Sequence, residues 1–111
     1  CIAGVDDPQT GTADVEKALA GIQKPVILLT HTPDVMPKVP ETVNLTLAGH
    51  LHGGQIRLNE AIIVPSAYGK KYANGFLLDH NRKIYTTKGL GTSILPIRFN
   101  CTPEIVVLEF E

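Results

Sequence analysis

Apolar segments in the first half of the chain follow a strand, helix, strand, strand order. The apolar residues 2–5 predict a short buried strand, and the Asp-, Pro- and Gly-rich residues 6–12 predict a turn. A helix is expected next, with Thr12 as its N-cap, because acidic residues occupy the turn that follows. Pro25 prevents this helix from continuing. Its apolar face recurs at spacings of four and three residues, at Val15, Leu19 and Ile22.

Two further strands follow the helix, and each leads into a histidine. Residues 25–31 form an apolar run that ends at His31, which is typical of a strand covered on both faces. Residues 43–49 alternate between apolar and polar and predict a strand that runs into His50. The proline-rich residues between them, 32–42, predict a loop without regular structure. This order of elements indicates an α/β protein.

The second half of the chain predicts short strands and turns. The first two of these strands are joined at Asn59 and Glu60, and the next two flank a turn that contains His80. The residues from 88 to 104 are rich in Gly, Pro and small polar residues and predict a long loop. The strands are expected at residues 55–58, 61–64, 75–79, 83–87 and 104–110. The whole chain therefore predicts one β-rich α/β unit, with one mainly β sheet and one clear helix.

Three of the four histidines fall where predicted strands end. His31 closes one strand, and His50 and His52 follow the next, with glycines on both sides of the pair. Sites in α/β sheets gather where strands end, so neighbouring strands would bring the three imidazoles together. Converging imidazoles are good ligands for Zn, Mn, Fe or Ni. His80, in contrast, is expected to be a solvated turn residue.

Other interpretations of the histidines remain open at this point. A single histidine at a strand end, such as His31, is more often a hydrogen-bonded core residue than a metal ligand. A histidine pair two residues apart also occurs on cupin β scaffolds, which require a glutamate after three or four intervening residues. Ile56 and Arg57 occupy those positions here, and the nearest acid, Glu60, lies too far along the chain.

Composition narrows the range of partners. The chain has 111 residues, a formal charge of −1 and no basic run, so bulk charge indicates no nucleic-acid surface. Its apolar runs of about four residues are far shorter than a membrane-spanning helix. The two cysteines, Cys1 and Cys101, are expected to be free thiols rather than a disulfide framework. The chain starts at Cys1 and enters an apolar strand at once, so we expect a piece of a longer protein.

Three motifs together resemble the calcineurin-like metallophosphoesterases, in particular a bacterial branch that acts on phosphodiester or pyrophosphate bonds. They are "ILLTHTPD", "GHLHGGQ" and "GLGTSILPIRF". The resemblance implies a four-layer α/β/β/α sandwich with two divalent metal ions, where His31 and His50 bind one ion and His52 the other. It also implies that His50 and His52 are catalytic, with the phosphoester as substrate. Two such ions hold a phosphoryl oxygen and activate a water molecule.

Residues outside the histidine motifs are weaker candidates for the site. Arg98 is a candidate phosphate contact because fixed positive groups stabilise charge that develops on phosphorus, and it could equally be a structural arginine. Asn100 and Ser93 are less favoured candidates of the same kind. Asp6 and Asp7 are expected to form a turn, or to support the metal ligands from behind.

The earlier motifs of the resembled family, D-x-H, G-D-x-x-D and G-N-H-D/E, do not occur in the sequence. Residues 1–111 are therefore expected to be the C-terminal portion of a single domain whose N-terminal half lies outside this chain. Alone, the chain is expected to be inactive and to expose an apolar sheet face through which it dimerises or binds the missing half. The parent is expected to be cytoplasmic, or membrane-associated through an N-terminal segment.

Two other functions remain open on the sequence alone. The first is a non-catalytic β-rich interaction domain that binds one metal ion through its histidines. The second is a β-rich interaction module in which the histidines only pack. The sequence upstream of Cys1 would separate them from the enzyme, because only the enzyme requires the three missing motifs there.

Overall fold

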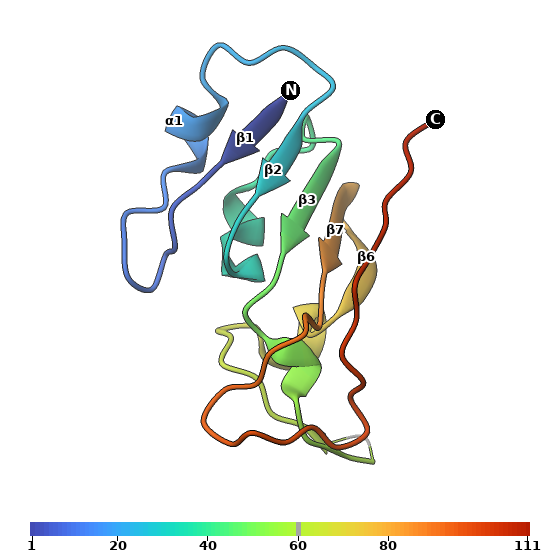
Figure 1. Ribbon diagram of the computed structural model, residues 1–111. Helices are drawn as coiled ribbons and strands as arrows, with labels where there is room; N and C mark the ends of the chain where they lie inside the picture. Colours follow the sequence, from blue (N-terminus) through green and yellow to red (C-terminus); the bar gives the residue numbers. More distant parts are fainter. Residues whose placement is uncertain (60) are drawn as a thin grey trace.

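A five-stranded sheet forms the centre of the computed structural model, which describes residues 1–59 and 61–111 (Figure 1). The predicted linkage through Glu60 lies outside these residues. The first four strands of the sheet run parallel, and the last is antiparallel to its neighbour. In spatial order they are β1 (Ile2–Gly4), β2 (Ile27–Leu29), β3 (Leu45–Ala48), β7 (Arg82–Thr86) and β6 (Gly75–Asp79). The predicted α/β class and the 75–87 hairpin are confirmed.

The other elements are short. Strands β4 (Arg57–Leu58) and β5 (Ala61–Ile62) form a separate antiparallel pair, close to where the sequence predicts them. The helix predicted before Pro25 is α1 (Val15–Leu19). Three 3₁₀ helices complete the structure: η1 (Pro33–Lys38), η2 (His52–Gly54) and η3 (Gly69–Tyr72). None of the helices in the described part of the chain is long and apolar enough to cross a membrane.

Asp14, not Thr12, is the N-cap of α1, so the predicted start of the helix is wrong by two residues. The Asp14 carboxylate accepts a hydrogen bond from the backbone N–H of Lys17 at 2.9 Å. The Thr12 N–H is held by the carboxylate of Asp6 instead, which extends the preceding turn. The side chain that reaches a free N–H at the helix start therefore decides the cap.

Replacing Asp14 with alanine is expected to lower the free energy of unfolding by about 1 kcal/mol, because the first turn loses its side-chain acceptor. Urea denaturation followed by circular dichroism measures this change. Asp14→Ser, which keeps an acceptor oxygen, serves as the matched control and should stay near the parent value. Equal stability of the alanine variant would show that this cap contributes nothing.

One face of the sheet carries the hydrophobic core. Leu28 of β2 and Ile84 of β7 are fully buried there against Val15 of α1 and Met36 of η1. Helix η1 lies within the segment predicted to have no regular structure, so that prediction is wrong. Thr32 caps η1 through its side-chain oxygen, and prolines are tolerated at the first helical positions. Burial of Met36 then stabilises the helix against the sheet.

The opposite face of the sheet is apolar and open, as predicted for a half-sandwich. Ile2 is 71% exposed, Leu29 43% and Phe76 61%, and Tyr85 of β7 is paired in register with Leu47 of β3 and Phe76 of β6. Strand β2 was expected to be covered on both faces, but in this chain only one of its faces is covered. The reason is that α1 and η1 pack on the same side of the sheet.

The C-terminal segment does not form the strand expected over residues 104–110. It runs past β6 as an extended tail (Figure 1), and none of its described residues is assigned to a strand. Glu104 anchors its start through an N–H donated to the carbonyl of Gly89 at 3.0 Å and an ion pair with Lys88 at 3.1 Å. The apolar run over residues 105–108 is suited to a strand, but a strand also requires a neighbouring backbone.

Candidate metal centre

His31 and His50 lie together at the carboxyl ends of two adjacent parallel strands. Strand β2 leads into His31 and β3 into His50, and Gly49 donates its N–H to the His31 carbonyl at 3.1 Å. The two imidazole rings are 4.6 Å apart between centroids and tilted by 57°. The two strands are neighbours, as the convergence of the histidines required, and His31 and His50 come together. The convergence of all three histidines is not found, because no group of three potential metal ligands lies together among the described residues.

The His50 ring has a nitrogen ready to bind a ligand. Its Nε2 atom is buried and has no hydrogen-bond partner among the described residues. Burial, together with the nearby His31, lowers the pKa of His50 and keeps the imidazole neutral. A neutral imidazole with a free lone pair is the form that binds a metal ion. An unpaired buried nitrogen is costly unless a ligand completes it.

His52 is oriented by a backbone carbonyl. Its Nδ1 lies 3.1 Å from the oxygen of Gly91. A carbonyl only accepts hydrogen bonds, so Nδ1 carries a proton, and in the neutral form of the ring Nε2 then has the free lone pair. Metal-binding histidines commonly have this arrangement, because the carbonyl fixes both the tautomer and the ring orientation.

The histidine turn has an unusual backbone. His50, His52 and Gln55 all have positive φ angles, at 69°, 50° and 49°. Residues other than glycine seldom adopt positive φ angles, and such backbone strain is concentrated at functional sites. The two following glycines permit close packing, because a Cβ on Gly53 would lie 2.9 Å from the sulfur of Cys101.

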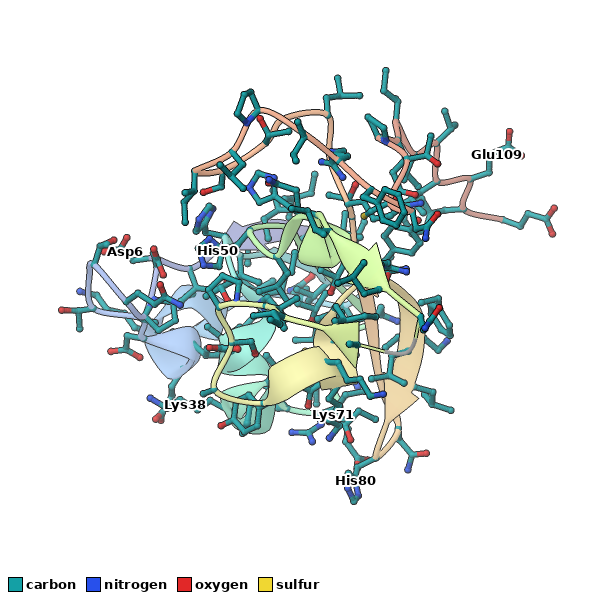
Figure 2. All side chains as sticks on the ribbon, turned by 90° about the horizontal axis from the view of Figure 1, so that it is seen from below. Asp6, Lys38, His50, Lys71, His80 and Glu109 are labelled. Carbon is teal, nitrogen blue, oxygen red and sulfur yellow. The ribbon has the colours of Figure 1, made fainter. Side chains whose placement is uncertain are left out.

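The turn after β1 brings carboxylates to the same edge of the sheet. Figure 2 shows Asp6 and His50 on the same side of the molecule. Asp7 accepts hydrogen bonds from the N–H of Gln9 and the hydroxyl of Thr10, and the first of these lowers its pKa, with smaller effects of His31 and His50. The predicted turn role is thus confirmed, and Asp7 also lies within electrostatic range of the histidines.

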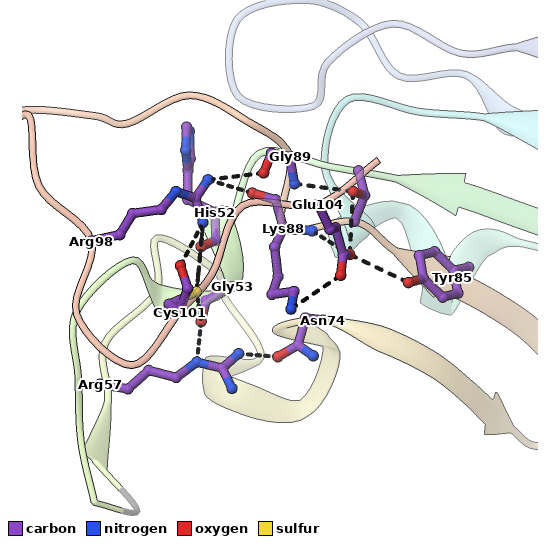
Figure 3. Close-up of polar contacts among 11 residues, drawn as sticks. His52, Gly53, Arg57, Asn74, Tyr85, Lys88, Gly89, Arg98, Cys101 and Glu104 are labelled. Carbon is purple, nitrogen blue, oxygen red and sulfur yellow. Dashed lines mark hydrogen bonds and ion pairs between the residues drawn. The ribbon is translucent and has the colours of Figure 1, made fainter. Parts of the chain in front are cut away.

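Arg98 donates hydrogen bonds to several backbone carbonyls around the site (Figure 3). Its guanidinium donates to the carbonyl of His52 at 3.2 Å and to that of Gly91 at 2.6 and 3.1 Å. The same Gly91 carbonyl therefore holds both Arg98 and the His52 ring. Further acceptors are the carbonyls of Lys88, Gly89 and Cys101. The structure thus places Arg98 behind the histidine turn, where it joins that turn to the 88–101 loop.

The other predicted phosphate contacts also meet backbone groups. Asn100 donates its side-chain N–H to the carbonyl of Arg57 at 3.3 Å. Ser93 is held by Gln55, whose side-chain oxygen accepts the Ser93 N–H at 2.6 Å and whose NH₂ donates to the Ser93 carbonyl at 3.1 Å. The described hydrogen bonds of both residues thus connect loop segments.

Gln55 is a site residue that the sequence analysis missed. Besides both backbone groups of Ser93, its amide reaches the carbonyl of Leu95 at 2.9 Å. The available signal was its position at the end of "GHLHGGQ", directly after the two glycines. Its partners lie 38 and 40 residues away, so spacing alone does not reveal them.

The donor set fits a divalent transition metal in part. His50 and His52 each offer an imidazole nitrogen, and His31 lies beside the first. No group of three or more potential ligands converges in metal-binding geometry within residues 1–59 and 61–111. A complete centre therefore requires ligands in addition to those that these residues bring together.

Comparison with known proteins identifies relatives over nearly the whole chain. It is 42% identical to the uncharacterized metallophosphoesterase YkuE of Bacillus subtilis, over 99% of this chain and 40% of that protein. It is 40% identical to the phosphodiesterase YaeI of Escherichia coli, over 77% of this chain and 32% of YaeI. An uncharacterized metallophosphoesterase of Helicobacter pylori is 36% identical over 91% of this chain and 28% of its own length. No family model and no solved structure matches the chain.

Proposed function

Because the chain belongs to the calcineurin-like metallophosphoesterase family, we propose that it supplies the histidine part of a dinuclear centre that hydrolyses phosphodiester or pyrophosphate bonds. The observation that carries this proposal is the buried, unpartnered Nε2 of His50 beside the His31 ring. A buried nitrogen without a hydrogen-bond partner destabilises a folded protein unless a ligand binds it. A metal ion would be such a ligand, because neutral imidazole is the form of histidine that binds metal ions.

Each histidine has a proposed place in the centre. His31 and His50 bind one ion and His52 binds the other, with Mn, Zn, Fe and Ni all compatible with imidazole. Such ions supply Lewis acidity and a nucleophilic water when bound. We also propose His50 and His52 as the catalytic residues of this chain, as the family resemblance implies.

The surrounding residues orient this set. The Gly91 carbonyl keeps the His52 proton on Nδ1, and Arg98 holds that carbonyl in place. We propose Arg98 as a positioning residue for His52. A phosphate contact by Arg98 or Asn100 remains a further proposal, in which their N–H groups are shared between substrate and the carbonyls they bind here.

The chain spans less than half the length of the relatives YkuE, YaeI and the H. pylori protein. We propose that residues 1–111 are the C-terminal portion of a four-layer α/β/β/α sandwich, and that the remaining ligands lie in an N-terminal half. Carboxylates from that half would offset the repulsion between two ions. The open sheet face of this chain would pack against a second sheet, contributed by the N-terminal half. Alone, the chain would be inactive and would dimerise through that face.

We propose that the parent protein is either cytoplasmic or attached to a membrane through a segment N-terminal to this chain. A phosphoester substrate and the N-terminal half are the two proposed partners.

Mn²⁺-dependent hydrolysis of an aryl phosphodiester tests the proposal. We expect the parent protein, extended upstream of Cys1, to release the aryl alcohol, and the 111-residue chain to be silent because it lacks the carboxylate ligands. Activity of the purified short chain, with longer contaminants excluded by mass spectrometry, would refute the shared centre. Silence of the parent with Mn, Zn, Fe and Ni would favour a non-catalytic metal-binding domain.

A further inference from the structure

The backbone of Gln55 joins the histidine turn to the 88–101 loop. Its N–H donates to the His52 carbonyl at 3.0 Å, and its own carbonyl accepts the N–H of Phe99 at 3.0 Å. Its φ angle of 49° lies in the region that residues other than glycine seldom adopt. Such a conformation persists only where the surrounding contacts hold it. A long side chain at a position suited to glycine therefore indicates that the side chain itself is needed.

The side chain of Gln55 makes both kinds of hydrogen bond to the same loop. Its oxygen accepts the N–H of Ser93 at 2.6 Å, and its NH₂ group donates to the carbonyls of Ser93 and Leu95 at 3.1 and 2.9 Å. A primary amide provides an acceptor and two donors at once. An ionised glutamate has the same length but only acceptors, so it could not bind the two carbonyls. The contacts of this loop thus match glutamine in particular.

The loop segment that Gln55 holds is the segment that orients His52. Gly91, whose carbonyl lies 3.1 Å from Nδ1 of the His52 ring, is two residues before Ser93. Arg98 donates to the carbonyls of both His52 and Gly91, and it directly precedes the residue whose N–H binds the Gln55 carbonyl. Gln55 therefore fixes the loop close to each of the two groups that set the ring of His52.

We propose that Gln55 is a positioning residue for His52, which it orients through the Gly91 carbonyl and Arg98. This role rests on the proposed function, because the ring held in this way is a ligand of one of the two proposed metal ions. Gln55 touches neither the metal nor the substrate in this role. Its hydrogen bonds all join residues of this chain, and they do not require the surrounding surface to stay open.

The ring tautomer of His52 in the metal-free parent protein tests this role. NMR of isotopically labelled ring nitrogens shows which nitrogen carries the proton, at about pH 8.5, where imidazoles are neutral. In the parent we expect the proton on Nδ1, bound to the Gly91 carbonyl. In Gln55→Glu the carboxylate repels the Ser93 and Leu95 carbonyls and the loop shifts. The ratio of Nδ1–H to Nε2–H should then fall at least about threefold, because the hydrogen bond to His52 is weakened.

A second variant and a matched control accompany this measurement. Gln55→Met keeps the length of the side chain and removes its hydrogen bonds, so it should shift the tautomer in the same direction. Gln23→Glu makes the same chemical change at an exposed position before the amino end of β2, whereas the histidines follow the carboxyl ends of the strands. Its His52 tautomer should equal that of the parent. The His52 signal is identified by its loss in His52→Ala.

Calorimetric titration with Mn²⁺ provides a second readout. Gln55→Glu should weaken the binding of one ion at least about tenfold, as the loss of groups behind a metal-binding histidine commonly does, and leave the other ion unchanged. The Mn²⁺ concentration for half-maximal activity should rise with it. Equal weakening of both ions, together with a lower free energy of unfolding, would show a general structural role and overturn the positioning role.

The tautomer measurement separates this role from the proposed function. An unchanged His52 tautomer in both Gln55→Glu and Gln55→Met would overturn the positioning role, even if activity fell. A parent that binds no Mn²⁺ and hydrolyses no phosphodiester, but whose His52 tautomer shifts in both variants, would refute the proposed function alone. The orientation of the ring by Gln55 would then stand.

Discussion

The His50→Ala variant of the parent protein is expected to lose at least about 1,000-fold in metal-dependent phosphodiesterase activity, equivalent to roughly 4 kcal/mol of transition-state stabilisation. The reason lies in the geometry of its ring. The buried Nε2 of His50 has no protein partner among the described residues, and it lies beside His31 at the edge of the sheet. Removal of the ring leaves His31 without its neighbouring donor, so the metal ion that we propose the two histidines share would be lost.

The measurement has two parts, initial rates with Mn²⁺ and metal content per chain by atomic emission. Both should fall together in His50→Ala, because activity depends on the bound ion. His80→Ala is the matched control: the His80 side chain is 83% exposed in the turn between β6 and β7, so neither quantity should change. A His50→Ala variant with unchanged rate and metal content would remove His50 from the centre and reassign its ring to packing.

The strands that position this site could be predicted from the sequence. Residues 25–31 end in His31 and residues 43–49 lead into His50, and the parallel pairing of β2 with β3 fits the α/β order. Hydrophobic pattern and the usual location of sites were therefore enough to bring His31 and His50 together. Their approach to 4.6 Å confirms that part of the reasoning.

Elements that depend on distant partners could not be predicted in this way. Helix η1 forms in a proline-rich segment because Met36 finds a place in the core under β2 and β7. Residues 104–110 contain an apolar run that is typical of a strand, yet they pair with no neighbouring strand among the described residues and stay extended. In both cases tertiary packing decides the outcome over local pattern.

Within the site, too, some features could be predicted from the sequence and others could not. The histidines and glycines of the "GHLHGG" stretch mark it as a candidate site in the sequence. The contacts that orient it, from Gly91 to His52 and from Arg98 to the His52 carbonyl, join residues 39 and 46 positions apart. Spacing carries no information about such contacts, so the sequence marks Arg98 as important without showing that it holds the loop.

Asp79 is the buried charge on which the β6–β7 hairpin depends. Its carboxylate is 6% exposed and accepts hydrogen bonds from Tyr72 at 2.7 Å, Lys71 at 2.9 Å and Arg82 at 3.1 Å. Arg82 also donates to the carbonyl of Met36 at 2.8 Å. One carboxylate thus joins the hairpin to η3 and, through Arg82, to η1.

Replacing Asp79 with alanine is expected to lower the free energy of unfolding by about 3 kcal/mol, because it leaves the buried Tyr72 hydroxyl and the Arg82 charge without their acceptor. Urea denaturation of the chain measures the loss. Asp79→Asn, which keeps one acceptor oxygen, should lose less. Lys83→Ala, an exposed substitution on the same hairpin, is the control and should change stability by less than about 0.5 kcal/mol.

The loss of stability on replacing Asp79 should also depend on pH. Hydrogen bonds from Tyr72 and Lys71 hold the pKa of Asp79 below its ordinary value. A carboxyl group with a lowered folded pKa stabilises the protein fully above its ordinary value of about 4, and this contribution disappears as the pH falls through the lowered value. The stability difference between the parent chain and Asp79→Asn should therefore be constant from neutral pH down to about 5 and narrow below 4. A difference that stays constant into strong acid would show that packing, rather than the carboxylate charge, stabilises the hairpin.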